Sequence, residues 1–425
     1  MGVTILFVIM ENPEANLDRG LGCFNSYAMA EYITQLIEHK QDFSMLDISF
    51  ERDGLFEESG MDKGEIMREI IRITHPYKDI FVFKKRYLGF ILISRKKQWL
   101  EAAGKEISNY LQGLEFRHEN VTLVLSNQAD FMKNPDDLMR FLSFVGEEYA
   151  DKHGKLLVVN DNIIEKYREQ DVIKKEITAA LEDNRVEVFL QPIFSNKKKY
   201  FTSAEALVRI RKKTGELLPP GLFIPIAEES GQILEIGERV LKVCDFLKNS
   251  NAVQLGLEYI EVNLSVIQCE QSELARRLIE IADSYGVEPK RINLEITETA
   301  SISARTTLLN NMKTLMEYGF TFSLDDFGKG ESNLMYVVEM PVSIVKLDYD
   351  MSKAFFTSPK AKHVVRAVVK MAHDMNLKLV AEGIETKEEI DSMYQENIDY
   401  IQGYYYSKPL PMQEALLFLS EYGKE

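Results

Sequence analysis

Short runs of β-forming residues recur from residue 186 to the end of the chain, with helical stretches between most of them. The runs cover residues 186–194, 201–210, 259–265, 291–297, 320–326, 343–347, 378–382 and 400–407. Eight strands within roughly 240 residues match the count and length of a TIM-like (β/α)8 barrel. Only Ser195–Tyr200 joins the first two runs. That connection is too short for a crossover helix, so we expect an antiparallel hairpin and a barrel that is irregular at its start.

Residues 1–160 show a different pattern, which predicts a separate α+β or α/β sandwich. The expected strands are 3–10, 43–50, 79–83, 90–93, 121–125 and 156–159, and the expected helices are 26–39, 62–73, 97–111 and 135–150. The charge-rich segment 161–181 has apolar residues at helical spacing, which predicts a connecting helix. We expect this helix to enter the second domain.

Composition excludes several classes of function. The formal net charge is −16, and such a surface repels nucleic acid and acidic membranes. No apolar run reaches the roughly 20 residues that a membrane-spanning helix needs. Because no basic segment and cleavage site follow Met1, we expect no signal peptide. The cysteines, Cys23, Cys244 and Cys269, are widely spaced and odd in number. They indicate a reducing compartment and neither a disulfide framework nor a zinc cluster.

Polar residues end nearly every strand of the expected barrel, where the chemistry of such folds is located. They are Gln191, Glu205, Asn263, Glu295, Asp325, Asp326, Lys346, Glu382 and Gln402. A single acidic residue in a barrel is usually part of a salt bridge at the rim. Five carboxylates at one mouth without balancing arginines cannot all be ionised unless cations neutralise them. Carboxylate and amide oxygens suit Mg²⁺ or Mn²⁺ and argue against zinc.

The adjacent pair Asp325 and Asp326 suggests two cations. Successive residues at a strand end point to different sides, so one carboxylate can bridge two metals while the other holds one. Two metals in this arrangement would flank a phosphoryl group and activate a water molecule. Lys346 could orient that water or stabilise developing charge, or it could form a buried salt bridge with a neighbouring aspartate. The loop with Gly328 and Gly330 could close over a substrate or be an ordinary connection.

The order of motifs resembles that of EAL domains. The matching segments are FLQPI (189–193), AEALVRI (204–210), LFIPIAEESGQI (222–233), VNLS (262–265), LEITE (294–298), LDDFGKG (324–330), IVKLD (344–348), AEGIET (381–386) and QGYYYSKP (402–409). The resemblance covers about residues 170–425. It implies a barrel that hydrolyses cyclic di-GMP to linear pGpG with two Mg²⁺ or Mn²⁺ ions and is inhibited by Ca²⁺. It also implies a bacterial cytoplasm and a homodimer formed through the EAL domain.

The resemblance assigns roles residue by residue. The first-metal ligands would be Glu205, Asn263, Glu295 and Asp325, and the second metal and its water would be served by Asp325, Asp326 and Glu382. Lys346 would lie beside the nucleophile. Substrate contacts would come from Gln191, Arg209 and Gln402, and support for the loop after the aspartate pair from Glu298 and Glu385.

Some positions depart from the family pattern. Lys329, Glu331 and Asn333 replace typical residues of the loop after the aspartates, and Ile210 stands where tryptophan is usual. These changes bring into question the rate of the reaction, the closure of the loop over substrate and the coupling between subunits of a dimer. They bring the reaction itself into question less. They keep open the alternative of a non-hydrolytic cyclic di-GMP receptor or a protein-interaction module, although none of the catalytic positions is missing.

The first domain resembles a degenerate GGDEF domain. DRGLGCFN (18–25) loosely matches its opening, FSMLDISF (43–50) its first metal-bearing strand and FKKRYLGF (83–90) its signature hairpin. The signature Gly-Gly-Asp-Glu-Phe is replaced by Arg86-Tyr87-Leu88-Gly89-Phe90, so the acidic metal-binding pair is absent. A cyclase needs that metal, so the resemblance implies a regulatory domain without synthesis of cyclic di-GMP. An unrelated α/β sensor domain is the alternative.

Another metallohydrolase class is also conceivable, because His373-Asp374 spells the dipeptide of HD-type phosphohydrolases. Those enzymes need several histidine ligands, and the chain has six histidines in all. His363 and His373 lie on one predicted helix with no others nearby, so we interpret both as surface residues.

Overall fold

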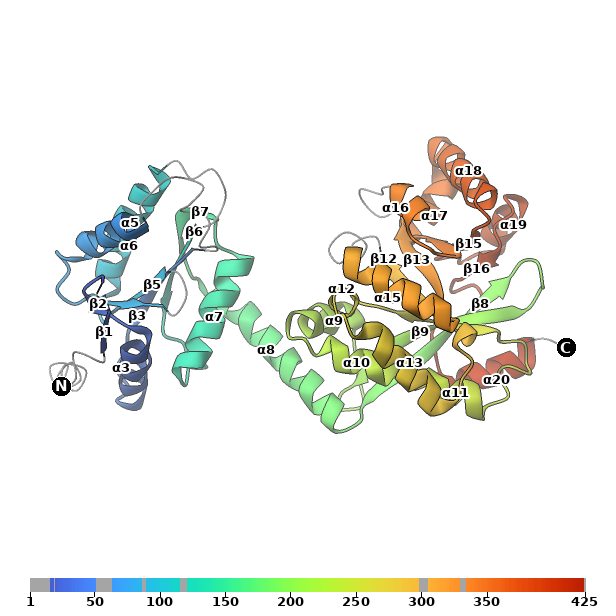
Figure 1. Ribbon diagram of the computed structural model, residues 1–425, viewed down its shortest axis with the longest axis horizontal. Coiled ribbons are helices and arrows are strands. Elements are labelled where there is room, and N and C mark those ends of the chain that lie inside the picture. The colour runs from blue at the N-terminus through green and yellow to red at the C-terminus, as the bar shows by residue number, and fades with distance from the viewer. Residues whose placement is uncertain are drawn as a thin grey trace. The chain divides into compact units, whose positions relative to one another are not determined.

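The protein divides into two compact units, Met1–Asp171 and Val172–Glu425, in a computed structural model (Figure 1). The described residues are 16–18, 20–50, 63–85, 89–114, 121–297, 305–328 and 334–423. The strand expected at 3–10 therefore lies outside the described residues. So do Glu298, Lys329, Glu331, Asn333 and residues 86–88 of the hairpin.

The first unit is a three-layer α/β sandwich. Its sheet has the order β1-β2-β4-β5-β3-β6-β7. The strands are β1 (Leu17–Asp18), β2 (Cys23–Phe24), β3 (Ser44–Phe50), β4 (Phe81–Lys84), β5 (Gly89–Ser94), β6 (Val121–Asn127) and β7 (His153–Val158). The helices are α3 (Ser26–Glu38), α5 (Lys63–Thr74), α6 (Lys97–Gln112) and α7 (Pro135–Glu148). All predicted elements within the described residues are present, with ends shifted by a few residues.

Alternation along the strands gives this sheet two apolar faces. Met45 and Ile91 pack with α3 and α7 in one core, whereas Leu46 and Leu92 pack with α5 and α6 in the other. The helix predicted at 161–181 is α8 (Asp161–Glu182). Its residue Ile163 belongs to the core of the first unit, and Ile177 belongs to a core of the second.

The second unit contains the predicted barrel of eight main strands. They are β8 (Val186–Ser195), β9 (Phe201–Arg211), β11 (Tyr259–Asn263), β12 (Ile292–Thr297), β13 (Thr321–Phe327), β14 (Ile344–Leu347), β15 (Lys378–Ala381) and β16 (Tyr400–Ile401). Neighbouring strands from β9 to β16 run parallel. β8 is antiparallel to both β9 and β16 and closes the barrel. The expected antiparallel start is therefore confirmed.

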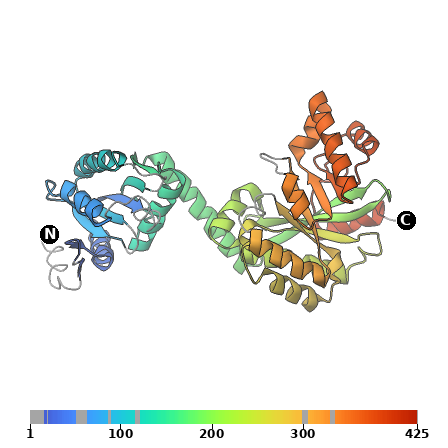
Figure 2. The ribbon, with the colours of Figure 1, turned by 45° about the horizontal axis from the view of Figure 1, so that its top comes forward.

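Helices surround this barrel (Figure 2) and bury the outward apolar residues of its strands. They are α9 (Pro220–Glu229), α10 (Ile233–Val240), α11 (Val243–Asn249), α12 (Val266–Cys269), α13 (Leu274–Tyr285), α15 (Arg305–Tyr318), α16 (Leu334–Glu339), α17 (Tyr349–Thr357), α18 (Pro359–Asp374), α19 (Lys387–Gln395) and α20 (Met412–Tyr422). Two further strands, β10 (Leu217–Leu218) and β17 (Leu410–Pro411), pair with β9 and β8. Inside the barrel, Ile193, Ile344 and Val380 form a small apolar layer, which supports the polar layer above it.

The last predicted strand is much shorter than the sequence suggested. β16 ends at Ile401, whereas the β-forming run continues to Ser407. The backbone turns because Gly403 packs directly on Ile384: a Cβ atom at Gly403 would lie 1.9 Å from the carbonyl oxygen of Ile384. Only glycine permits this approach. The turn places Gln402 at the carboxyl ends of the parallel strands, which form the mouth of the barrel.

Within the described parts of the chain, no helix combines the length and apolar character needed to span a bilayer. Cys23, Cys244 and Cys269 are all buried and free.

Candidate active site

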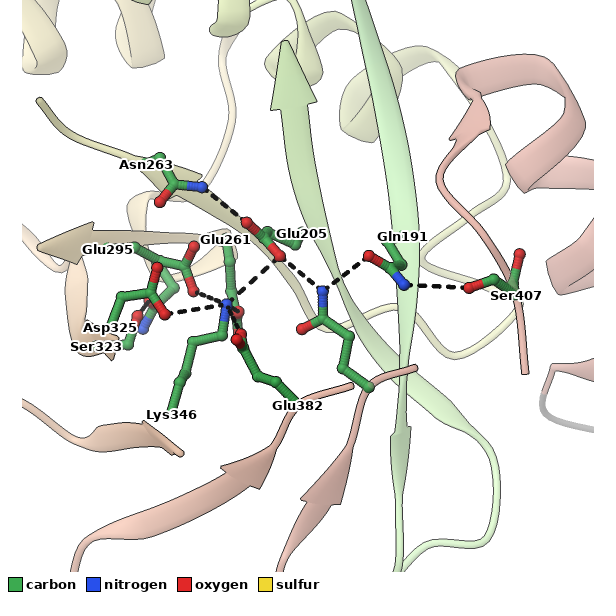
Figure 3. A network of polar contacts seen from close by, with 12 residues as sticks. Gln191, Glu205, Glu261, Asn263, Glu295, Ser323, Asp325, Lys346, Glu382 and Ser407 are labelled. Carbon is green, nitrogen blue, oxygen red and sulfur yellow. Dashed lines mark hydrogen bonds and ion pairs between the residues drawn. The ribbon is translucent and has the colours of Figure 1, made fainter. Parts of the chain in front are cut away.

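The mouth of the barrel contains one buried ammonium group surrounded by carboxylates (Figure 3). Lys346 on β14 is fully buried. Its Nζ atom lies 2.7 Å from Glu295 Oε1, 2.8 Å from Glu382 Oε1, 3.4 Å from Glu205 Oε2, 3.6 Å from Glu261 Oε2 and 3.7 Å from Asp325 Oδ1. Four of these carboxylates were predicted from strand ends. Glu261 was missed, because it lies within its strand and not at the end.

Strand register explains why these side chains meet. In the parallel ladder Asn263 pairs with Glu295, and Glu261 pairs with Glu205. Every second residue of a barrel strand points inward, so Glu261 and Asn263 both face the interior from β11. Glu261 lies one inward step closer to the amino-terminal end of the strands. By register, Asn263 and Glu295 form an upper level of the site, and Glu261 and Glu205 form the level beneath it.

A chain of amides holds Glu205 in place. Asn263 Nδ2 donates to Glu205 Oε1 at 2.8 Å, and Gln402 Nε2 donates to Glu205 Oε2 at 2.6 Å. Gln402 also donates to Gln191 Oε1 at 3.2 Å, and Gln191 Nε2 donates to the carbonyl of Ser407 at 3.1 Å. Both oxygens of Glu205 are thus fixed by neutral donors. Gln191 and Gln402, predicted to contact substrate, are buried behind this carboxylate.

A β-bulge shapes the aspartate pair. The register of β13 against β14 shifts between Leu324 and Phe327, and Asp326 has a φ of 57°. Aspartate tolerates this left-handed conformation better than most residues do. Asp325 and Asp326 consequently line the same cavity. The expectation that the two carboxylates point to different sides stays a prediction, because lining one cavity does not fix the direction of either side chain.

Burial and mutual repulsion shift the pKa values of these groups. Burial alone would lower the pKa of Lys346, but Asp325, Glu205, Glu295 and Glu382 outweigh it and raise the pKa well above its ordinary value. Burial raises the pKa of Glu295 strongly and that of Glu382 to about 8, in both cases against the opposing charge of Lys346. Without further cations, the single positive charge of Lys346 does not balance the negative charges of the carboxylates around it.

The donor chemistry fits divalent cations. Both oxygens of Glu295 and Oδ1 of Asp325 are buried and accept no well-oriented hydrogen bond from the described residues. In the described parts of the chain, no three acidic, histidine or cysteine side chains form a ready-made coordination cage, and the carboxylates turn toward Lys346 instead. Oxygen ligands of this kind are those that Mg²⁺ and Mn²⁺ prefer. The side chains able to hold such ions are Glu205, Asn263, Glu295, Asp325, Asp326 and Glu382.

A cavity of 500 Å³ adjoins the carboxylates. Its polar wall includes Arg209 and the aspartate pair, and its apolar wall comes from Leu207, Ile224, Ile233, Ile236 and Val240. The Arg209 guanidinium lies 5.6 Å from the ring of Phe189. Among the predicted substrate-contacting residues, Arg209 is thus placed at an open surface. The cavity can hold an apolar or aromatic ring next to an anionic group.

Other predicted residues lie apart from this cluster. Glu385 follows β15 and pairs with Lys353 at 3.5 Å, so its predicted role in supporting the loop stays a prediction. Ile210 is fully buried in a core beside β8. His373 Nε2 lies 3.0 Å from Asp399 Oδ2, away from the mouth.

The pKa of Glu382 predicts how metal-free stability depends on pH. The carboxyl titrates at about 8 when folded and near its ordinary value of about 4.3 when unfolded. Between these values the folded protein binds the extra proton, so stability falls as pH rises from about 5 to 8. Thermal unfolding in chelator across this range should show the fall, and Glu382→Gln should flatten it. Glu385→Gln is the matched control, and wild-type and Glu382→Gln curves with equal slopes would contradict the assignment.

Comparison with known protein families assigns a family to the barrel unit. A family model described as "EAL domain" matches residues 174–409. The signaling protein YkoW of Bacillus subtilis is 30% identical over 253 residues, covering 59% of this chain and 31% of that protein. The cyclic di-GMP phosphodiesterase PdeL of Escherichia coli is 29% identical over 265 residues, covering 62% of this chain and 71% of PdeL.

Among solved structures, the one named "PaMucR Phosphodiesterase, c-di-GMP complex" is 28% identical with a TM-score of 0.53. It covers 57% of this chain and 99% of that chain. The present chain aligns with 31% to 49% of the length of the first curated relatives it matches.

Proposed function

The chain belongs to the EAL domain family, and from this premise we propose that it is a metal-dependent phosphodiesterase that hydrolyses cyclic di-GMP to linear pGpG. The observation that carries the proposal is the convergence of Glu205, Glu295, Asp325 and Glu382 on Lys346 at the mouth of the barrel. Relatives named as cyclic di-GMP phosphodiesterases support the choice of substrate.

The carboxylates and Asn263 would hold two Mg²⁺ or Mn²⁺ ions. Glu205, Asn263, Glu295 and Asp325 would serve one ion, and Asp325, Asp326 and Glu382 would serve the other. Bound ions of this kind polarise a phosphoryl group and increase the acidity of a water molecule. Ca²⁺, which takes more ligands at longer distances, is expected to inhibit.

The chain's own residues fix the reacting groups. Lys346 stays protonated at neutral pH because its pKa is raised well above the ordinary value. It therefore supplies a permanent positive charge next to the reacting phosphate and its attacking water. Gln402 and Asn263 prevent Glu205 from rotating. Arg209 offers its guanidinium to the substrate from the wall of the cavity.

Product analysis tests this proposal. Purified protein is mixed with cyclic di-GMP and Mg²⁺, and in parallel with Ca²⁺. We expect pGpG to accumulate with Mg²⁺ and not with Ca²⁺. Binding of intact cyclic di-GMP in Mg²⁺ without product would instead establish the receptor alternative.

We further propose that the first unit is a GGDEF-like domain that does not synthesise cyclic di-GMP. Asp47 is buried in β3, the strand that resembles the metal-bearing one. Lys85 Nζ lies 2.7 Å from Asp47 Oδ1 and 2.6 Å from Ser49 Oγ. The lysine already neutralises this carboxylate, which leaves little electrostatic reason for a cation to bind there.

The prediction for this unit is that GTP is not converted to cyclic di-GMP with Mg²⁺ or Mn²⁺. The assay is best run on Glu205→Ala, so that any cyclic product is not degraded. Nucleotide chromatography after long incubation should show GTP alone. Accumulating cyclic di-GMP would overturn the assignment.

We also propose that the protein works in a bacterial cytoplasm, as a homodimer formed through the barrel unit.

A further inference from the structure

Glu261 differs from the other carboxylates around Lys346. It is fully buried, and its Oε2 lies 3.6 Å from Lys346 Nζ. Within the described residues, the other four carboxylates in contact with Lys346 all belong to the set that would hold cations. Glu261 lies one inward step beneath Asn263 on β11 and is level in register with Glu205. Neither the strand-end pattern nor the ligand assignment gives it a role.

Burying the Glu261 carboxylate costs free energy that another interaction must offset. A buried charge without a partner is strongly unfavourable, and neither oxygen of Glu261 accepts a well-oriented hydrogen bond from the described residues. Lys346 is its cationic contact. Ser203, one inward step lower on the neighbouring strand β9, pairs in register with Tyr259 and carries a buried hydroxyl.

The position of Lys346 depends on which carboxylates remain available to it. When Glu205, Glu295, Asp325 and Glu382 bind cations, their negative charge is shared between those cations and Lys346. These four carboxylates then balance the charge of the ammonium group less completely. A counter-ion one inward step beneath Asn263 and Glu295 keeps the ammonium at the base of the site and out of the cation positions. Glu261 has the charge, the depth and the contact for this task.

We propose, on the basis of the function above, that Glu261 is a positioning residue that holds the Lys346 ammonium from below. It does not touch substrate and acts through Lys346. Two consequences follow: Glu261 and Lys346 are energetically coupled in the folded protein, and loss of Glu261 affects turnover more than substrate binding.

A double-mutant cycle tests the coupling without relying on activity. Wild type, Glu261→Gln, Lys346→Met and the double variant are compared by thermal unfolding at pH 8, in chelator and again with saturating Mn²⁺. In the Lys346→Met background Glu261 has lost its counter-ion. We therefore expect Glu261→Gln to shift Tm upward by at least about 2 °C more there than in wild type. The Mn²⁺ series keeps the cycle measurable if Lys346→Met does not fold in chelator.

Kinetics provide the second readout. Glu261→Gln should lower kcat about 10-fold or more, as is typical for residues that orient a metal site, with KM for cyclic di-GMP nearly unchanged. Ser203→Ala, a change of a buried polar residue one inward step lower on β9, is the control and should retain wild-type kcat.

The outcomes separate this inference from the proposed function. Equal Tm shifts in both backgrounds, or wild-type kcat in Glu261→Gln, would overturn the role of Glu261 even if the wild type hydrolyses cyclic di-GMP. If the wild type proves inactive, coupled Tm shifts still support the Glu261–Lys346 pair, and uncoupled shifts reject it.

Discussion

Replacing Glu205 with alanine is expected to reduce cyclic di-GMP hydrolysis by more than about 100-fold. Residues that merely orient metal ligands typically contribute 10- to 100-fold, and Glu205 would itself be a ligand. The change also removes the carboxylate that accepts hydrogen bonds from Asn263 Nδ2 and Gln402 Nε2. Both amide side chains then lose the contact that orients them. Initial rates of pGpG formation in Mg²⁺, with calorimetric titration of Mn²⁺, measure the effect.

The fold should survive this change, because Glu205 lies at a polar mouth and its removal opens no apolar core. Glu187→Ala is the matched control: Glu187 is on the adjoining strand β8 and pairs with Arg211 outside the site. The control should keep wild-type rates and Mn²⁺ binding. Turnover by Glu205→Ala at the wild-type rate would show that the metal assignment is wrong.

Replacing Lys346 with methionine should abolish hydrolysis and strongly destabilise the metal-free protein. Breaking a buried ion pair by removing one partner typically costs about 3–5 kcal/mol, because it leaves a buried charge unpaired. Five carboxylates would lose their common ammonium contact. Chemical denaturation in chelator at pH 8 should show the loss of stability.

Two further conditions identify the origin of that loss. Lowering the pH to 5 should reduce it, because protonated carboxyls no longer repel one another, and saturating Mg²⁺ should restore part of the stability without restoring activity. Lys353→Met removes an ion pair with Glu389 near the surface and should change stability by about 1 kcal/mol or less. Equal effects of the two lysine substitutions would contradict the central role of Lys346.

The sequence predicted the barrel well because its strands are short, apolar and regularly spaced. The antiparallel start followed from the length of one connection, Ser195–Tyr200. The prediction failed where a local contact overrides β propensity. The run 400–407 looks like one strand, but Gly403 must lie against the backbone of Ile384, and no pattern in the run itself reveals that partner.

The site was predicted in part for a similar reason. Polar residues that end apolar strands are conspicuous, so Glu205, Glu295 and Glu382 could be found. Glu261 was missed because only strand ends were considered. It lies two residues before Asn263 in YIEVN, so the alternation of a strand already places both side chains on the inner face. The bulge at Asp326 could not be predicted, because a residue's φ angle cannot be read from a pair of aspartates.

The antiparallel strand β8 has a consequence for the order in which the site is completed during synthesis. The barrel closes when β16 pairs with β8, and the hydrogen bond from Gln402 to Gln191 joins residues 211 positions apart. At about 5–20 residues per second, a ribosome needs roughly 10–40 s to make that interval. The hairpin that carries Glu205 is therefore made early and waits for one of the last segments of the barrel. A nascent chain cannot hold Glu205 in its final geometry until nearly the whole barrel has emerged.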